Sequence, residues 1–389
     1  MLGACAPLTQ PPNSSSPFGT TQPAASQSAS PSPNPTAPPA RAAALGALLA
    51  RPVGTPFERA SYHVAVIADD GRVVASVKAR EPSPSDGFFL PKLSATTRGV
   101  YYLDGDTDLK LLRPDGTSAT VRQLPGSRSA RVVFAVSPDD EWIALSVISY
   151  GPPDPACQVS CGPSWTAKSY VERLTVAAER TDFAVALRDL GFAIAYPVGW
   201  RQGMVVLADG YAVIQNPGYV NPYAARDRYA LVDPKTDRVA QRIGRERASA
   251  EDCAITGPLV PAGTACLASR SVRFWTWDGM FQTFVSDSAV LYDVNEYALP
   301  AALSPSGSAV AVALASGRIV LAPSPTRLPE DVVGSPIGWL DDTHLVFAAP
   351  AGTMKIFDKA RGSVTSLALI NEPVAPFGTF FAPLTTGLD

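Results

Sequence analysis

Three aspartates alternate along one short segment of the chain, Asp104, Asp106 and Asp108. Carboxylates in this spacing can gather around a hard cation such as Ca²⁺. The segment also joins two apolar stretches, as a polar hairpin turn does, and the complete acidic calcium-loop motif is absent. The hairpin turn is the default interpretation and a weak calcium site is the alternative. The sequence predicts no other metal site.

Four of the five cysteines form two close pairs. Cys157 and Cys161 are separated by three residues, and Cys253 and Cys266 lie symmetrically about a Gly-Pro-rich turn region. A single Cys-x-x-x-Cys without a nearby histidine is a poor zinc signature, whereas both spacings allow local disulfides. Two disulfides indicate an oxidising compartment; buried, reduced thiols of a cytosolic protein are the alternative.

Nothing in the sequence supports nucleophilic catalysis. The chain lacks the Gly-x-Ser-x-Gly, His-Glu-x-x-His and glycine-rich phosphate-loop motifs. Its two histidines, His63 and His344, fit packing or surface positions, so we predict no catalytic residue and no cofactor. A carboxylate pair assembled by the fold, as in some glycosidases, stays open, with Glu251 and Asp252 as its candidates.

Aromatic residues gather in two long segments, residues 150–168 and 209–228. Aromatic side chains on a rigid scaffold favour contact surfaces. They serve equally well to pack a long loop against its own domain, and the sequence leaves both interpretations open. The candidate contact residues are Trp165, Tyr211, Tyr219, Tyr223 and Arg226.

The balance of charge bounds the possible partners of these residues. The chain has 389 residues and a formal net charge of −3. Such a balance carries no electrostatic footprint for nucleic acid. No run of eighteen apolar residues is present, so the sequence predicts no membrane span.

The N-terminal segment has the composition of a tether. Residues 1–40 contain no charged residue and ten prolines. Few bulky apolar side chains are available there to offset the entropy of ordering, so we expect a disordered linker over residues 6–50. Residues 41–51 could form a short helix. Residues 1–5 end in Leu2-Gly3-Ala4-Cys5, which resembles a bacterial lipobox remnant; the basic and apolar regions that precede such a box are missing. The resemblance implies lipidation of Cys5, and a fortuitous cysteine is the alternative.

The body of the chain repeats one pattern. Residues 135–147 and 302–314 align without gaps, each as an apolar strand, a Ser-Pro turn and a second apolar strand. Residues 337–350 follow the same plan with two aspartates at the turn. Turn residues recur every eight to twelve positions, as in sandwiches, barrels and propellers. The repeat favours the propeller.

These repeats resemble the WD40-like, TolB-type propeller repeat of bacterial envelope proteins, with a Ser-Pro-Asp-Gly signature. The resemblance covers about residues 57–384 and implies an all-β propeller with four antiparallel strands per blade; counting the strands along the chain gives a seven-bladed propeller. The repeat lengths place six blades at residues 90–126, 129–190, 192–245, 249–287, 297–333 and 335–370. Residues 59–80 and 372–383 would then supply two strands each to a shared last blade, placing Val64 and Phe380 in one sheet.

The position of the long segments within this plan suggests a function. Both fall between the second and third strands of neighbouring blades, so both lie on one face, while the short turns of the opposite face indicate a structural role. We therefore expect a binding or scaffold module of the cell envelope, anchored extracytoplasmically by lipid alone, that engages a protein, peptide or glycan through the face with the insertions. An extracytoplasmic hydrolase or lyase with a carboxylate site at the channel is one alternative. An accessory part of a larger assembly is another.

Overall fold

The computed structural model divides the chain into two compact units, Met1–Arg41 and Ala42–Asp389. The residues that the structure describes all belong to the second unit. They are 44–52, 60–68, 71–82, 93–153, 163–192, 194–209, 228–244, 254–268, 271–285, 301–314, 316–323, 326–367 and 373–383.

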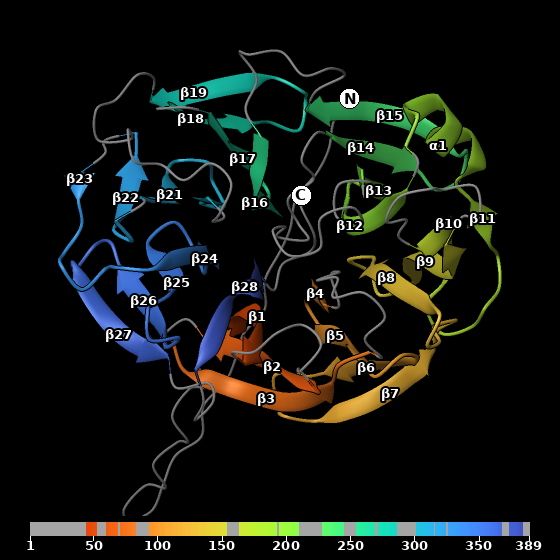
Figure 1. The fold of residues 1–389 in the computed structure, drawn as a ribbon, viewed down its shortest axis with the longest axis horizontal. Helices are drawn as coiled ribbons and strands as arrows, with labels where there is room; N and C mark the ends of the chain where they lie inside the picture. The colour runs from red at the N-terminus through yellow and green to blue at the C-terminus, as the bar shows by residue number, and fades with distance from the viewer. Residues whose placement is uncertain are drawn as a thin grey trace, which may run out of the picture. The chain divides into compact units, whose positions relative to one another are not determined.

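The second unit consists of four-stranded antiparallel sheets, which we number as blades (Figure 1). Blade 1 contains β4 (Leu93–Thr96), β5 (Gly99–Asp104), β6 (Asp108–Leu112) and β7 (Ser118–Gln123). Blade 2 contains β8 (Ala130–Val136), β9 (Trp142–Pro153), β10 (Pro163–Arg173) and β11 (Thr181–Asp182), and is followed by α1 (Ala184–Leu190). Blade 3 contains β12 (Ala195–Arg201), β13 (Met204–Asp209), β14 (Arg228–Asp233) and β15 (Arg238–Gly244).

Three further blades follow in chain order. Blade 4 contains β16 (Ala254–Val260), β17 (Gly263–Ala268), β18 (Ser271–Trp275) and β19 (Phe281–Val285). Blade 5 contains β20 (Ala302–Leu303), β21 (Val310–Ala313), β22 (Ile319–Ala322) and β23 (Thr326–Arg327). Blade 6 contains β24 (Ser335–Trp339), β25 (His344–Ala348), β26 (Met354–Asp358) and β27 (Ser363–Leu367).

Blade 7 joins the two ends of this unit. Its strand order is β28-β1-β2-β3, with β28 (Val374–Pro383) from the C-terminal side and β1 (Ala44–Pro52), β2 (Ser61–Ala68) and β3 (Val73–Arg80) from the N-terminal side. Leu49 of β1 pairs with Val64 on one side and with Phe380 on the other. The predicted seven-bladed propeller, closed by a shared blade, is therefore confirmed.

The composition of blade 7 differs from the prediction in one respect. The C-terminal segment supplies one strand instead of two, and the N-terminal side supplies three. The additional N-terminal strand is β1, the first in the chain, and it lies where the sequence predicted a linker and a short helix. The propeller thus begins before the expected boundary at residue 57.

Burial explains why β1 is a strand. Alanine and leucine favour a helix locally, but Ala47, Leu48 and Ala50 are almost completely buried. Their strand is hydrogen-bonded to β2 on one side and β28 on the other. A short isolated helix would bury none of these side chains, so pairing with both neighbours overrides the weak local preference.

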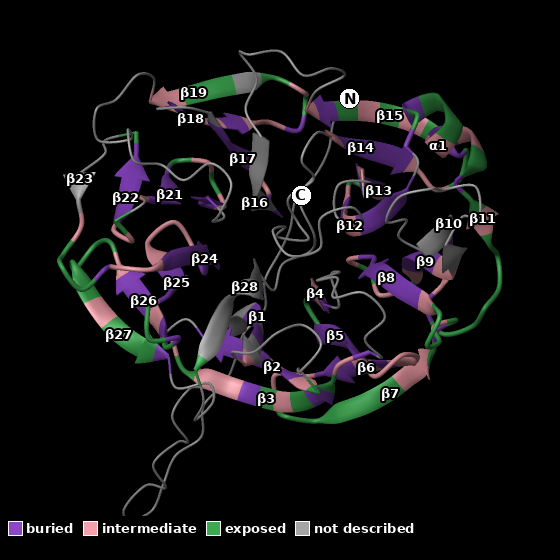
Figure 2. Cartoon of the chain, in the orientation of Figure 1, coloured by how far each residue is buried: buried purple, intermediate pink, exposed green. Residues whose placement is uncertain are grey.

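Each blade packs against two neighbours, and this shapes the strand sequences. The strand Gly99–Asp104 is buried at five successive positions. Its Tyr101 joins the core shared with blade 2, whereas Tyr102 joins the core shared with blade 7. Figure 2 shows that the inner strands of the blades are mostly buried, whereas outer strands such as β7 are exposed. Strands buried on both faces read as continuous apolar runs instead of alternating ones.

The Ser-Pro turns that define the repeat close each hairpin through the serine. The hydroxyl of Ser137 accepts a hydrogen bond from the backbone N–H of Trp142 at 2.9 Å and donates its proton to the Asp139 carboxylate. In blade 5, the Ser304 hydroxyl accepts the N–H of Ala309 at 3.1 Å. Serine hydroxyls suit such turns because they bond to nearby backbone groups.

A second repeat fastens neighbouring blades to each other. The motif Pro-x-Gly-Trp ends the first strand of blades 3 and 6, with a register shift between its proline and its glycine. The indole N–H of Trp200 donates to the carbonyl of Ala135 in blade 2 at 2.9 Å. The indole of Trp339 donates to the carbonyl of Ala302 in blade 5 at 2.8 Å. Both carbonyls lie two residues before the turn serine, so the two junctions share one design.

The role assigned to β1 predicts the effect of truncating one of its side chains. Leu48→Ala should lower the free energy of unfolding by about 2–5 kcal/mol, because it leaves a cavity in a fully buried site. Urea unfolding followed by circular dichroism measures this change.

The control for this variant is Val176→Ala, at a side chain that is 55% exposed, which should change the free energy by no more than about 0.5 kcal/mol. Equal effects of the two substitutions would contradict the placement of Leu48 inside the closing sheet.

Candidate functional site

Both insertions lie between the second and third strands of their blades, β9 and β10 in one and β13 and β14 in the other. The first is shorter than the predicted range 150–168, because β9 extends to Pro153 and β10 begins at Pro163. At the base of the second insertion, Arg228 forms an ion pair with Asp209 at 3.3 Å. The backbone of Trp165 is part of β10, paired with Tyr150, while its side chain is not described.

Most of the predicted functional residues lie outside the described part of the chain. This group comprises the insertion residues Tyr211, Tyr219, Tyr223 and Arg226, the channel candidates Glu251 and Asp252, and the cysteines Cys5, Cys157, Cys161 and Cys253. The binding face, the carboxylate site and the lipid anchor therefore stay predictions. Cys266 is described and completely buried, in β17; its pairing with Cys253 stays a prediction.

The aspartate-rich segment is a hairpin turn between β5 and β6. Asp104 pairs with Asp108 across this turn. The Asp104 carboxylate receives hydrogen bonds from Lys110 at 2.5 Å and from Arg80 at 3.0 Å. Arg80 also reaches Asp108, at 3.3 Å. Asp106 faces Arg131 at 3.6 Å.

These ion pairs explain the acidic turn without a metal. All three carboxylates face cationic side chains of the protein. Among the residues that the structure describes, no group of three or more histidine, cysteine, aspartate or glutamate side chains is arranged to hold a metal ion. The hairpin interpretation is thus the one that the geometry supports.

The pairing has a measurable electrostatic consequence at Asp104. Partial burial by itself would raise the pKa of this carboxyl group. The hydrogen bonds from Lys110 and Arg80 stabilise the charged form more strongly and lower the pKa to about 2. Asp104 thereby ties blade 7, through Arg80, to blade 1.

A cavity of about 360 Å³ lies between blades 2 and 3. Four turns surround it: the β8–β9 and β10–β11 connections of blade 2, and the β12–β13 and β14–β15 connections of blade 3. We call it the inter-blade cavity, and its size falls within the range of small-ligand sites. Its lining residues are Ser137, Pro138, Asp139, Trp142, Val171, Glu179, Thr181, Trp200, Gly203, Pro234 and Lys235.

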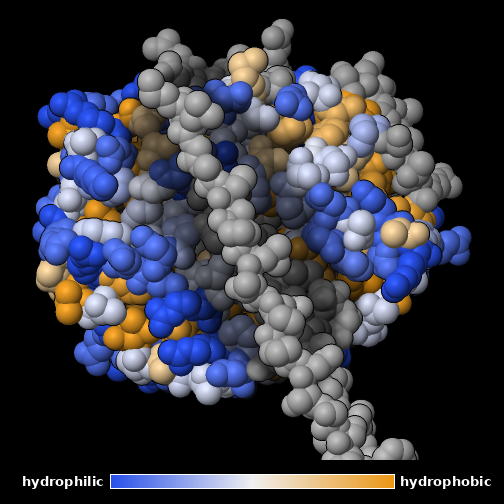
Figure 3. Space-filling model, turned by 180° about the vertical axis from the view of Figure 1, so that it is seen from behind, coloured by the Kyte–Doolittle hydropathy of each residue, from blue (hydrophilic) through white to orange (hydrophobic). Residues whose placement is uncertain are grey.

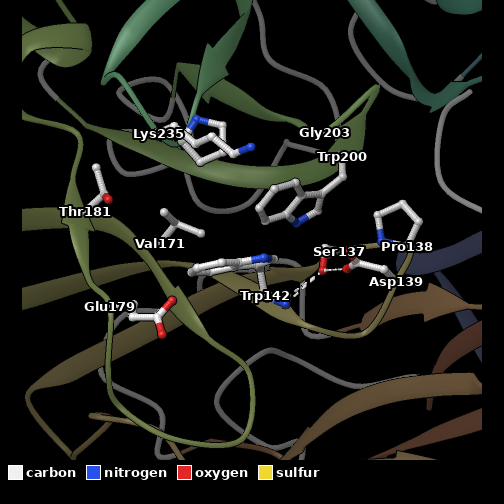
Figure 4. Close-up of a pocket in the computed structure, with 11 residues that line it drawn as sticks. Ser137, Pro138, Asp139, Trp142, Val171, Glu179, Thr181, Trp200, Gly203 and Lys235 are labelled. Atoms are coloured by element: carbon white, nitrogen blue, oxygen red, sulfur yellow. Dashed lines mark hydrogen bonds between the residues drawn. The ribbon is translucent and has the colours of Figure 1, made fainter.

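Two tryptophans provide the main apolar walls of the inter-blade cavity. In Figure 4 the indoles of Trp142 and Trp200 lie next to each other, with Asp139 toward one end and Glu179 toward the other. Trp200 is fixed by its hydrogen bond to Ala135. The guanidinium of Arg173, which does not line the cavity, covers one face of Trp142 at 4.2 Å from the ring centre.

Charged groups of both signs stand at the mouth of the inter-blade cavity. Glu179 accepts a hydrogen bond from Arg173 at 3.0 Å, which raises the pKa of that arginine. Asp139 accepts bonds from the Ser137 hydroxyl at 2.5 Å and from the backbone of its own turn. Lys235 is exposed, so the rim combines two carboxylates and one ammonium group.

The turn that carries Lys235 is itself held by a carboxylate. Asp233 accepts the backbone N–H of Lys235 and the hydroxyl of Thr236, both at 2.8 Å. These bonds lower the pKa of Asp233, with the backbone bond from Lys235 as the largest cause. The aspartate therefore stays charged and fixes the turn at neutral pH.

Uncommon backbone conformations concentrate around the inter-blade cavity. Within the described ranges, four non-glycine residues have a positive φ angle, and each lies in a different one of the four surrounding turns. They are Asp140 (59°), Glu179 (55°), Gln202 (49°) and Asp237 (53°). Positive φ is uncommon for such residues and persists where the surrounding structure requires it, often at functional sites.

The junction between blades 5 and 6 has the same Ser-Pro turn and motif tryptophan but differs in two features that bear on the cavity. Five residues after the turn serine, blade 2 has Trp142 where blade 5 has Ala309. The turn after the motif tryptophan is one residue longer in blade 6, where Trp339 pairs with Leu345 and the turn contains Asp342; in blade 3 Trp200 pairs with Val205 and the turn contains Gly203. The Asp342 carboxylate accepts the backbone N–H of Ser306 in blade 5 at 3.0 Å and so bridges the two blades. At Gly203 an added β-carbon would meet no atom within 4 Å, so the space next to this residue is open and its side-chain position forms no bridge between blades 2 and 3.

The inter-blade cavity does not lie on the face where the sequence predicted a binding site. The four turns belong to the face whose short connections indicated a purely structural role, opposite to the insertions. The short turns gave no sign of the inter-blade cavity because it is formed by side chains from two blades. The sequence did hold a signal in the Pro-x-Gly-Trp repeat, in Trp142 where blade 5 has Ala309, and in the shorter turn that contains Gly203.

Three comparisons place the chain among known proteins. No protein-family model matches it, and no curated protein does either. Among solved structures it is similar to a chain of a mitotic checkpoint complex, with 11% identity over 78% of this chain and 84% of that one and a TM-score of 0.39. It is also similar to apo AztD from Citrobacter koseri, with 11% identity over 88% and 99% of the two chains and a TM-score of 0.40. The fold assignment therefore rests on the sheet topology.

The low pKa of Asp104 predicts an acid-dependent contribution to stability. A carboxyl group whose pKa is lower in the folded state stabilises that state above its unfolded pKa, near 3.8. The contribution disappears as the pH falls toward about 2. Asp104→Asn should therefore reduce stability at pH 6 and flatten its decline between about pH 4 and pH 2. Urea unfolding at a series of pH values measures both effects.

Asp331→Asn, in an exposed turn, controls for the general loss of one carboxylate. If the acid branch of the Asp104→Asn profile kept the wild-type slope, the ion-pair account of this turn would be wrong.

Proposed function

We propose that this chain is a ligand-binding module whose site is the inter-blade cavity between blades 2 and 3. A β-propeller fold is consistent with a binding or scaffold role. The observation that carries the proposal is the difference between two junctions that share the Ser-Pro turn and the motif tryptophan. Blades 5 and 6 are bridged by Asp342, whereas the junction of blades 2 and 3 has Trp142 next to Trp200 and a shorter turn that contains Gly203.

The conformation of the surrounding turns supports the same proposal. A left-handed backbone at a non-glycine residue costs about 1–2 kcal/mol; the four turns around the inter-blade cavity each contain one such residue, and Glu179 among them lines it. The packing of the rest of the fold offsets this cost, and all four residues lie in turns at the junction of blades 2 and 3. A rigid scaffold that presents loop residues around a concave, largely apolar site is the usual form of a small-ligand site.

A crystallographic fragment screen on the full chain tests the proposal. We expect small aromatic or cyclic fragments to bind between Trp142 and Trp200 in the wild-type protein. Gly203→Asn should abolish this binding, because it adds a side chain at a residue that lines the inter-blade cavity. Asparagine is chosen because it tolerates the positive φ of this position, 74°.

The matched control is Asp342→Gly, which alters the junction between blades 5 and 6 and should leave binding in the inter-blade cavity intact. Fragments that bound wild type and Gly203→Asn equally, or that bound only elsewhere, would contradict the proposed site.

We further propose that the module works outside the cytoplasm, anchored at the cell envelope by a lipid on Cys5. The lipobox-like Leu2–Cys5, the uncharged proline-rich segment after it and the paired cysteines support this location. Among the described residues, no helix is long and apolar enough to span a membrane. The insertion residues Trp165, Tyr211, Tyr219, Tyr223 and Arg226 would then serve a separate contact with a protein, peptide or glycan partner.

Mass spectrometry of the chain purified from its native source tests this location. We expect a diacylglyceryl group on Cys5 and, without reduction, peptides linked through Cys157–Cys161 and Cys253–Cys266. An unmodified N-terminal peptide together with four alkylatable thiols would contradict the proposal.

A further inference from the structure

We infer that the ligand of the inter-blade cavity is a neutral sugar unit held against Trp142. This inference rests on the proposed function and adds the chemical class of the ligand. It follows from two properties of the lining: its flat apolar walls and the mixed charge of its rim.

The walls suit a ring with an apolar face. Trp142 has one face covered by Arg173, which leaves its opposite face and its edge for the inter-blade cavity. Val171 is 2% exposed and Trp200 is 4% exposed, so these walls are well packed. A pyranose ring presents C–H groups on its faces, and burying them against an indole removes apolar surface from water.

The rim selects against charged ligands. Asp139 and Glu179 would repel an anion; a quaternary ammonium ligand, although the carboxylates attract it, has no hydrogen-bond donor for them and no acceptor for Lys235. A hydroxyl group can donate to a carboxylate and accept from an ammonium group, so it satisfies both. A ring with several hydroxyls matches carboxylates toward both ends of the indoles and the lysine on the neighbouring turn (Figure 4).

A proline-rich peptide fits the lining less well. Aromatic grooves that recognise such peptides combine stacking with hydrogen bonds to the peptide backbone. The indole N–H of Trp200 is already donated to the carbonyl of Ala135. The carbonyl groups of a proline-rich peptide need hydrogen-bond donors. Lys235 is the cationic donor of the lining, whereas the two carboxylates can only accept.

The test measures binding of methyl glycosides of glucose, galactose, mannose and N-acetylglucosamine to the full chain by saturation-transfer NMR and tryptophan fluorescence. We expect at least one of them to bind. Trp142→Ala should weaken its affinity by about tenfold or more, whereas Trp142→Phe should retain most of it because an aromatic wall remains. Asp139→Asn and Glu179→Gln should each weaken binding several-fold, since charge-assisted bonds are the stronger ones.

Lys359→Ala is the matched control, because Lys359 lies near a different tryptophan, 5.8 Å above the Trp339 ring. It should leave sugar affinity unchanged. Circular dichroism of every variant separates a loss of binding from a loss of fold.

Two outcomes would overturn the inference while leaving the proposed function in place. One is that fragments occupy the inter-blade cavity but no glycoside does. The other is that tetramethylammonium or a proline-rich peptide binds there in a Trp142-dependent way and the glycosides do not. If neither fragments nor glycosides bind, the proposed function itself fails.

Discussion

The pairing of β28 with β1 is the constraint on which the rest of this structure depends. It joins segments more than three hundred residues apart in the chain, with Leu48 opposite Ala65 on one side and Phe381 on the other. Closing such a long loop is costly in entropy and is repaid only when all blades are in place. The same closure leaves no blade without a neighbour, so strands such as Gly99–Asp104 and Ala130–Val136 are buried at nearly every position. Continuous apolar strands, which would be a hazard at an open edge, become the stable solution.

In a closed ring of packed blades, the junctions between blades are the places where one repeat can differ from another. Two of these junctions share a Ser-Pro turn and a tryptophan that donates to the preceding blade. One is bridged by Asp342, and the other is open at Gly203 and lined by Trp142. The candidate site is therefore a local variation on a common scaffold, and the scaffold fixes its walls. Function on such folds generally comes from sites of this kind and not from the fold itself.

Prediction from the sequence succeeded where a signal is local and repeated. The repeat lengths and the spacing of turns gave the number of blades, and the Ser-Pro turns are local because Ser137 and Ser304 close their hairpins with bonds inside a few residues. Prediction failed for β1, because alanine and leucine are good helix formers and the residues that make it a strand are distant. The acidic turn is intermediate: its hairpin was readable from the sequence. The cations that face its carboxylates include Arg80, which precedes Asp104 by 24 residues, and no spacing rule indicated this partner.

By itself, the sequence determined the fold class, the number of blades, the shared last blade and the positions of the two insertions. These follow from turn chemistry and strand periodicity, which act between residues close in the chain. Only the tertiary structure decided which strand closes the ring and that an open cavity lies between Trp142 and Trp200. It also decided on which face that cavity lies. The physical reason is that each of these features is formed by side chains or strands from different blades. Their distances are set by packing across the whole ring and have no counterpart in any short stretch of sequence.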